Sequence, residues 1–322
     1  MKTLSSWLLA FAFGAAVCTA AAQGPTFAER LGWKKGDRVL ILHIDDAGMS
    51  HDSNLGVYKA MDQGVANSLS VMMPCPWVPE IVRYIKENPG IDAGLHLTMT
   101  SEWDLYRWGP LAGKPTVPGL TDSEGCLHDN VPLVVKNATP DEVETEIRAQ
   151  LDRARTMGFE PTHMDSHMGT LFATPEFLMR YIKVGIDQKI PVMFPGGHGF
   201  FIRQDSPERN FDQLEGIGKQ LWDAGLPVLD DLHNRSYGWK KTDKTDEYID
   251  AVKNLKPGVT MMIMHCTAPT AIFGKISDSG TTREGDLNAM VDPRFKKALE
   301  DEKIILSTFR EMMERRTALD KK

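Results

Sequence analysis

The sequence predicts an α/β fold in which a single domain forms a distorted (β/α) barrel, TIM-like, with seven or eight strands. Two observations lead to this prediction. Short apolar runs alternate with amphipathic segments from residue 37 almost to the C-terminus, and nearly every run is followed by helical periodicity. This is the pattern of parallel β-α-β units, and in a chain of 322 residues it favours a closed or incomplete barrel over an open doubly wound sheet.

The expected strands are eight short apolar runs. In chain order they cover residues 38–44, 67–73, 92–98, 161–167, 191–194, 227–230, 260–265 and 303–307. The expected helices carry apolar residues at helical spacing. They cover residues 53–63, 77–87, 141–157, 175–188, 208–224 and 246–254, with a closing helix after residue 307. No internal repeat or linker divides this pattern, so one domain is the simplest interpretation.

One long segment, residues 101–138, does not fit the alternation. It is rich in Gly, Pro and aromatic residues and is too long for a passive connection. Loops of this kind usually carry function. We therefore expect this segment to have a functional role.

The first 22 residues predict a secretory signal peptide. The charged start MKT, the apolar run LLAFAFGAAV and the small residues CTAAAQG follow one another in the order typical of such peptides, with cleavage expected near Ala22. The run is too short for a good membrane span, and no later segment approaches the roughly 20 apolar residues that a spanning helix needs. We therefore expect a mature domain of residues 23–322 that is exported, either to the periplasm or out of the cell, without stable membrane insertion.

Charge and cysteine content exclude several classes of protein. The formal net charge is -7, and no basic stretch is dense enough to follow a phosphate backbone, so nucleic acid is not an expected partner. Cys75, Cys126 and Cys266 remain after the signal peptide, without CxxC spacing. This pattern indicates neither a disulfide framework nor a zinc ribbon, although one disulfide stays open. Oligomeric state, including a homo-oligomer, stays open as well.

Polar residues of a particular kind end four of the expected strands. Asp45 and Asp46 end the first, His96 ends the third, the group His163, Asp165 and His167 ends the fourth, and His265 ends the strand at 260–265. The carboxyl ends of parallel barrel strands meet on one face, where catalytic groups collect. A rim that is merely solvated has no reason to favour His and Asp on four strands. Imidazole and carboxylate together are typical ligands of a divalent metal ion.

A metal ion also explains why two acids stand side by side. Asp45 and Asp46 repel each other, and burial gives them nothing unless a positive charge lies between them. A cation bound to one carboxylate removes the repulsion and leaves its neighbour ionised as a base. The pair is therefore interpreted as one base and one metal ligand.

Four segments of the sequence, which include most of these polar residues, resemble a known family. IDDAGMS with Asn54 in the following helix, GLHLTMTSEW, GPLAGKPTVPGLTDSEG and PTHMDSH occur in this order. Together they resemble the YdjC-like carbohydrate deacetylases, the chitooligosaccharide and hopanoid deacetylase group related to the polysaccharide deacetylases. The resemblance runs from about residue 38 to 170 and continues mainly in the block around His265.

The resemblance implies a deformed barrel, one divalent ion (Mg²⁺ or Zn²⁺) and hydrolysis of the N-acetyl group of an amino sugar or oligosaccharide, a reaction of carbohydrate metabolism. Carried over by position, Asp45 is the expected catalytic base and His265 the expected general acid. Asp46, His96 and His167 are the expected metal ligands.

Further residues are expected around this set. Asp165 is a candidate partner for the free nitrogen of a metal-bound histidine, and His163 a structural hydrogen bonder; a variant in which His163 replaces His167 as the ligand is open from the residues alone. Trp103, Tyr106 and Trp108 lie in the irregular segment. They are interpreted either as a sugar-binding lid or as rings that pack this segment onto the barrel.

Two alternative functions use the same scaffold. A metal-dependent hydrolase of O-acetyl or other acyl groups on glycans would need the same residues. A noncatalytic carbohydrate-binding protein would be expected to lack the base or a ligand, whereas Asp45, Asp46, His96 and His167 are all present. No GxSxG motif supports a serine nucleophile. The expected partner in each case is an acetylated carbohydrate.

Overall fold

The computed structural model describes residues 24–321. The predicted signal peptide therefore lies outside the described residues. The described chain contains one parallel sheet of seven strands. The strands are β1 (Arg38–Ala47), β2 (Ser68–Val71), β3 (Asp92–Leu97), β4 (Met164–Ser166), β5 (Asp231–His233), β6 (Gly258–Met264) and β7 (Ile305–Leu306).

The sheet has the order β4-β3-β2-β1-β6-β5, and β7 pairs with the first half of β1. Single parallel bridges continue the sheet from β4 to the segment around Val192, and from Pro195 to Leu229 just before β5. The sheet therefore curls into a distorted barrel, as the sequence predicts. The expected strands at 191–194 and 227–230 are wrong as regular strands, because only isolated bridges form there and β5 begins at Asp231.

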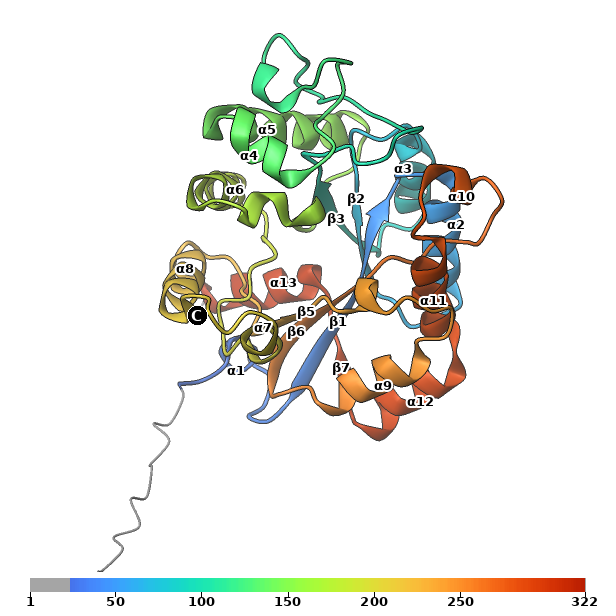
Figure 1. Ribbon diagram of the computed structural model, residues 1–322. Helices are drawn as coiled ribbons and strands as arrows, with labels where there is room; N and C mark the ends of the chain where they lie inside the picture. Colours follow the sequence, from blue (N-terminus) through green and yellow to red (C-terminus); the bar gives the residue numbers. More distant parts are fainter. Residues whose placement is uncertain (1–23, 322) are drawn as a thin grey trace, which may run out of the picture.

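Helices surround the curled sheet (Figure 1). They are α1 (Phe27–Arg30), α2 (His51–Asp62), α3 (Val78–Glu87), α4 (Val131–Asn137), α5 (Pro140–Thr156), α6 (Pro175–Gln188), α7 (Phe200–Asp205), α8 (Phe211–Asp223), α9 (Thr245–Lys253), α10 (Phe273–Ile276), α11 (Gly280–Val291), α12 (Pro293–Asp301) and α13 (Phe309–Leu319), with short 3-10 turns at Pro118–Leu120, His167–Phe172 and Ser236–Gly238. The predicted long helix begins where expected, because Thr139 and Glu142 form a capping box at the start of α5.

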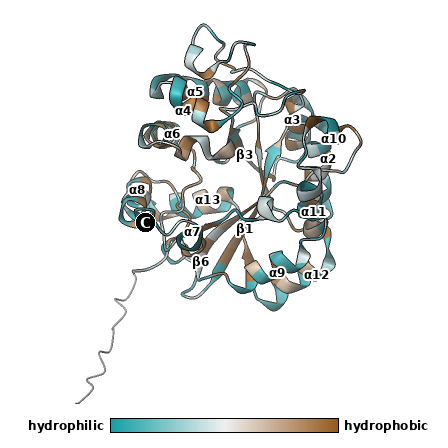
Figure 2. Cartoon of the chain, in the orientation of Figure 1, coloured by the Kyte–Doolittle hydropathy of each residue, from teal (hydrophilic) through white to brown (hydrophobic). Residues whose placement is uncertain are grey.

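The two faces of the sheet carry different side chains. Along β1, Leu40, Leu42 and Ile44 belong to the large apolar core between sheet and helices, whereas Val39 and Ile41 belong to a second apolar cluster. That second cluster also contains side chains of β6 and of α1 and α13, so it fills the base of the barrel interior. Figure 2 shows the hydrophobic colouring of β1 and β6.

The interior becomes polar toward the carboxyl ends of the strands. Side chains alternate along a strand, so the interior face that starts with Val39 and Ile41 continues with His43 and Asp45. On β2 and β3 the corresponding positions are polar or glycine, since His43 pairs with Ser68, and Ser70 with Gly94. The fold therefore places an apolar base and a buried polar layer in one barrel.

Among the described helices, none is both long and apolar enough to span a bilayer. Cys75, Cys126 and Cys266 are all unpaired, so the disulfide that the sequence left open does not form among these three residues.

Gly94 gives a direct test of the packing in the polar layer. The imidazole of His163 lies over Gly94 and stacks on Phe309, with ring centroids 4.2 Å apart. A Cβ atom at position 94 would lie 2.5 Å from His163 Nε2. We therefore expect Gly94→Ala to lower the free energy of unfolding by about 1–3 kcal/mol, the usual cost of overpacking a core.

The measurement is urea denaturation, with Gly90→Ala as the matched control. A Cβ at position 90 meets no atom within 4 Å, so the expected change is below about 0.5 kcal/mol. Equal effects of the two substitutions would contradict the packing described here.

Candidate active site

Asp45 and Asp46 enter the same pocket because the end of β1 is irregular. In an uninterrupted strand, neighbouring side chains point to opposite faces of the sheet. Here the pairing of β1 with β2 shifts register between Ile44 and Ala47, and Asp46 adopts a left-handed backbone conformation with φ of 65°. Aspartate tolerates this conformation better than most residues. Both carboxylates therefore lie near His96, with Asp45 Oδ2 3.8 Å and Asp46 Oδ1 3.2 Å from its Nε2 atom.

Asp46, His96 and His167 form a compact buried cluster. Asp46 Oδ1 lies 3.2 Å from His96 Nε2 and 3.2 Å from His167 Nδ1. One ligand atom from each residue lies within 4.8 Å of the others. Neither oxygen of Asp46 has a hydrogen-bond partner of good geometry. A carboxylate and two imidazoles that converge in this way can hold a divalent ion.

Each histidine of the cluster has a carboxylate on its other nitrogen. His96 Nδ1 lies 2.6 Å from Asp165 Oδ1, and His167 Nε2 lies 2.8 Å from Glu102 Oε1. Such outer carboxylates fix the tautomer and the orientation of metal-binding imidazoles. Both the three candidate ligands and the carboxylates that orient their imidazoles are therefore suited to a metal ion.

Arg283 completes the charge balance. Its guanidinium comes from α11, is 2% exposed and lies 2.6 Å from Asp46 Oδ2. Burial by itself would raise the pKa of Asp46, but Arg283, His167 and His96 together hold it well below its usual range. Asp46 is therefore ionised, as a metal ligand must be.

Asp45 has a different environment from its neighbour. It lies 3.3 Å from His43 and 3.9 Å from His265, and it lacks an arginine partner among the described residues. Burial raises its pKa above the usual value, although His96 and His43 oppose this effect. Two adjacent acids with pKa values moved in opposite directions are suited to different tasks. The environment favours Asp45 as the residue that takes up a proton.

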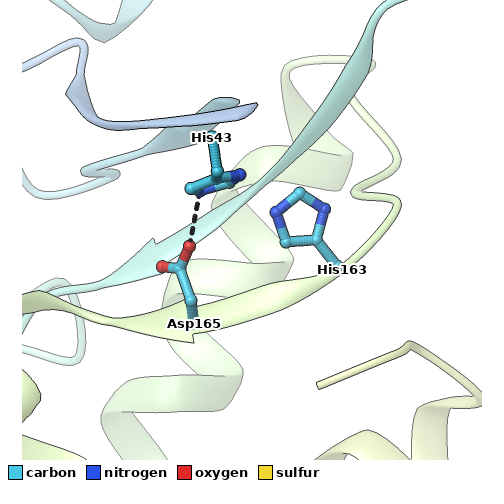
Figure 3. A group of neighbouring side chains, drawn as sticks. All are labelled: His43, His163 and Asp165. Atoms are coloured by element: carbon cyan, nitrogen blue, oxygen red, sulfur yellow. Dashed lines mark ion pairs between the residues drawn. The ribbon is translucent and has the colours of Figure 1, made fainter. Parts of the chain in front are cut away.

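A second group of buried residues, His43, His163 and Asp165, lies deeper in the barrel (Figure 3). Asp165 Oδ2 lies 2.8 Å from His43 Nε2, so this carboxylate joins His43 to His96. His43 also has Ser68 at 2.8 Å from Nδ1 and Ser70 at 3.0 Å from Nε2. Both nitrogens of His43 are therefore engaged, and this group fits a supporting role better than a metal site.

His163 is separate from the cluster of Asp46, His96 and His167. Its Nδ1 atom lies 3.0 Å from the hydroxyl of Thr162, and its ring stacks on Phe309. Burial lowers its pKa to about 4, so the ring is neutral at pH 7. This placement favours the structural role that the sequence suggested, and it separates His163 from Asp46.

His265 follows β6 directly and faces Asp45 across the cavity. Its Nε2 atom lies 3.9 Å from Asp45 Oδ2. Its backbone N–H donates to Asp286 at 2.9 Å, and Asp286 is itself paired with buried Lys244 at 2.8 Å. Burial holds the pKa of His265 well below its usual value. The ring is therefore neutral at pH 7 in the metal-free protein, and once protonated it would release its proton readily.

A cavity of about 550 Å³ is lined by the predicted site residues Asp45, Asp46, His96, His167 and His265. Its lining combines the buried polar cluster with further polar residues and with apolar side chains. The apolar side chains that line it include Met168, Phe172, Met193, Ile202, Leu232 and Ile263, and the polar rim includes Asp205, Arg209, Asn234 and Tyr237. A concave cavity in which converging polar groups stand beside apolar side chains is typical of a small-molecule site.

The three aromatic residues of the irregular segment do not line this cavity. Trp108 is buried and donates from Nε1 to the carbonyl of Thr100 at 2.9 Å. Trp103 and Tyr106 pack edge-on against it, and Trp103 also lies beside Arg283. This placement favours packing of the segment onto the barrel, and the proposed sugar-binding role of these rings stays a prediction.

Sequence reasoning missed three residues of the site. His43 has no role among the predicted site residues, yet its position two residues before Asp45 on one strand places both on the same face. Glu102 was quoted within GLHLTMTSEW but was given no role. Arg283 lies on α11, which is not among the predicted helices, and no local pattern distinguishes it from a surface arginine.

An α/β barrel whose carboxylates and imidazoles collect at the carboxyl ends of its strands has the architecture of a barrel enzyme. Comparison with known proteins defines the family more closely. The profile of the family described as YdjC-like protein matches residues 39–301. The chain belongs to the YdjC-like family.

Curated relatives match over most of their length. A carbohydrate deacetylase from Thermus thermophilus is 30% identical over 281 residues, which cover 84% of this chain and 92% of the relative. A carbohydrate deacetylase from Brevibacillus brevis is 29% identical over 276 residues, which cover 85% and 99%.

A solved structure shares the fold. It is that of a proposed cellobiose-phosphate cleavage protein from Enterococcus faecalis, with a TM-score of 0.71 and 20% sequence identity over 85% of this chain and 98% of that protein. At this identity the similarity supports the distorted barrel and is silent on activity.

The protonation of the cluster predicts how metal affinity depends on pH. Burial alone would lower the pKa of His167, but Glu102 and Asp46 raise it to about 9 in the metal-free protein. Below pH 9 this imidazole therefore holds a proton that an incoming metal ion must displace, so affinity should increase from pH 6 to pH 9.

The measurement is calorimetric titration of the metal-free protein with Zn²⁺. Buffers that differ in their heat of ionisation show how many protons are released on binding. We expect net proton release on binding at pH 7, and Glu102→Gln should reduce it by removing the carboxylate that stabilises the protonated ring. Glu124→Gln, at a side chain that is 71% exposed, is the control. Affinity that does not change with pH would contradict this assignment of His167.

Proposed function

We propose that this protein is a metal-dependent carbohydrate deacetylase that hydrolyses the N-acetyl group of an amino sugar or oligosaccharide. The observation that carries the proposal is the buried cluster of Asp46, His96 and His167 with a second carboxylate, Asp45, beside it. The relatives that match most of the chain are named carbohydrate deacetylases. The reaction is hydrolysis of a C–N bond that is not a peptide bond.

Asp46, His96 and His167 would hold the ion. A bound divalent cation lowers the pKa of water and polarises a carbonyl oxygen. Asp165 and Glu102 keep the two imidazoles oriented for this purpose, and Arg283 keeps Asp46 ionised. Two nitrogen ligands with one oxygen ligand suit Zn²⁺, and the same set accepts Mg²⁺ or Mn²⁺.

Asp45 would act as the general base. Amide hydrolysis requires a proton to leave the attacking water, and a carboxylate whose pKa is raised by burial is a better proton acceptor than an exposed one. The neighbouring Asp46 cannot take this role, because Arg283 and the two histidines hold its pKa low. The different surroundings of the two carboxylates therefore assign the base to Asp45 and the metal ligand to Asp46.

His265 would deliver a proton to the departing amine. Its Nε2 atom lies 3.9 Å from Asp45 Oδ2, a separation that small side-chain movements convert into a hydrogen bond. The neutral imidazole can therefore receive the proton that Asp45 takes from water and pass it to the nitrogen. Water and amide would thus be converted to acetic acid and amine, and transfer of the acid proton to the amine then gives acetate and ammonium.

Export of the mature domain is part of the proposal. Residues 1–22 have the composition of a signal peptide, which would bring the enzyme to acetylated glycans outside the cytoplasm. Isolation of the protein from the cytoplasm with an intact N-terminus would overturn this part of the proposal.

Acetate release from N-acetylated chitooligosaccharides tests the reaction. We expect purified protein to release acetate only when a divalent ion is present and to lose the activity with a chelator. Asp45→Asn should lower kcat by about 10²- to 10⁴-fold, the usual contribution of a general base, and should still bind the ion. Asp46→Ala should fail to bind it.

Asp141→Asn, at a side chain that is 82% exposed on α5, is the control and should leave activity unchanged. Metal binding without acetate release from N-acetylated sugars, but with release from O-acetylated glycans, would replace the amide by the ester as substrate. Retention of metal and full activity in Asp46→Ala would refute the proposed site.

A further inference from the structure

A second cavity of about 360 Å³ lies against the catalytic cavity. The short helix α7 is a common wall of the two. Ile202 and Asp205 of this helix line the catalytic cavity, whereas Phe201 and Gln204 line the second one. Successive positions of one helix therefore face two different sites.

The segment after β5 repeats this arrangement. Asn234 and Tyr237 line the catalytic cavity, and His233, Arg235 and Trp239 line the second cavity. The boundary between the cavities consists of α7 and the segment after β5, and it carries an ion pair in which Arg235 lies 2.7 Å from Asp205. Both side chains are about one-third exposed, at 32% and 40%, so this boundary lies at the surface. Asp205 lines one cavity and Arg235 the other, so the two cavities adjoin across this pair.

The second cavity combines aromatic rings with polar atoms that lack partners. Trp239 is partly buried and is held edge-on against Tyr248, with centroids 5.2 Å apart. Phe201 packs edge-on against His233 at 4.9 Å. Buried Nδ1 of His233 and Oε2 of Glu247 have no hydrogen-bond partner. Unpaired buried polar atoms are costly, and a ligand with several hydroxyl groups would relieve that cost.

Charge at this cavity also favours a neutral, polar ligand. Burial lowers the pKa of His233 to about 4, so its ring is neutral at pH 7. Arg235 is already paired with Asp205, and Glu247 with Lys241. A cavity of paired charges, neutral imidazole and a tryptophan face matches a sugar ring, which has hydroxyl groups at its edge and apolar C–H faces.

We propose that the second cavity binds another sugar residue of the same oligosaccharide whose acetylated residue occupies the catalytic cavity. The proposal rests on the proposed deacetylase function and adds that the substrate is a chain that crosses the Asp205–Arg235 pair. Trp239 provides the stacking face, and His233 and Glu247 bind hydroxyl groups. The enzyme therefore discriminates substrates by chain length.

The test compares N-acetylated substrates of one to six sugar residues. In the unmodified protein, kcat/KM should increase about tenfold once the chain is long enough to cross the boundary, the gain that a buried tryptophan contact typically provides. Trp239→Ala should remove this increase through KM while leaving kcat/KM for the monosaccharide unchanged. Trp239→Phe keeps an aromatic face and should restore most of it.

Trp222→Ala is the matched control, because Trp222 is also partly buried but lies on α8 away from both cavities. Gln204→Ala, at an exposed side chain of the second cavity, gives a second variant that does not depend on the fold tolerating loss of a tryptophan. Gln204→Ala should weaken the binding of only the longer substrates.

Calorimetric binding of the N-acetylated hexasaccharide to Asp45→Asn provides a readout that does not require turnover. Combining this variant with Trp239→Ala should weaken hexasaccharide binding about tenfold and leave disaccharide binding unchanged. Equal losses on all chain lengths, or no loss on any, would overturn the second sugar site. Failure of every N-acetylated substrate to react, with Trp239-dependent hexasaccharide binding intact, would instead refute the deacetylase function alone.

Discussion

The charge balance around Asp46 is the constraint on which the rest of the site depends. Four carboxylates, those of Asp45, Asp46, Asp165 and Glu102, lie within or beside one pocket, and buried like charges are stable only with compensating partners. Three imidazoles and one guanidinium provide this compensation at distances between 2.6 and 3.8 Å. Glu102 depends on His167 alone, whereas Asp45, Asp46 and Asp165 each contact at least two positive or protonatable partners. The cluster is therefore organised before any ligand enters.

The barrel makes this balance possible by separating two layers in its interior. The base is closed by apolar side chains of β1, β6, α1 and α13, which exclude water from below. The polar layer above it is supplied by β1 to β4, one or two side chains from each strand. The bulge at Asp46 adds the one carboxylate that regular alternation would have sent to the opposite face. Strain at this position is thus directly tied to function.

The fold and part of the site could be predicted from sequence, for reasons that particular residues illustrate. Apolar runs located six of the strands closely, and the placement of polar residues at their ends brought Asp45, Asp46, His96, His167 and His265 to one face of the barrel, where the structure brings them together. Glu102 and Arg283 were missed because they reach the site from a loop and from α11, and contacts between distant segments leave no local pattern. The aromatic trio near Glu102 illustrates the opposite limit: its composition leaves a sugar contact and loop packing both open, and the observed packing favours the second.

The claim at the centre of this account is that a divalent ion binds between Asp46, His96 and His167. Diffraction from crystals grown with Zn²⁺, measured at the zinc absorption edge, tests it most directly. The account predicts one anomalous peak within coordination distance of Asp46 Oδ1, His96 Nε2 and His167 Nδ1, with Asp45 beside it. A peak among His43, His163 and Asp165, or a protein that binds zinc with no peak at Asp46, would contradict the account.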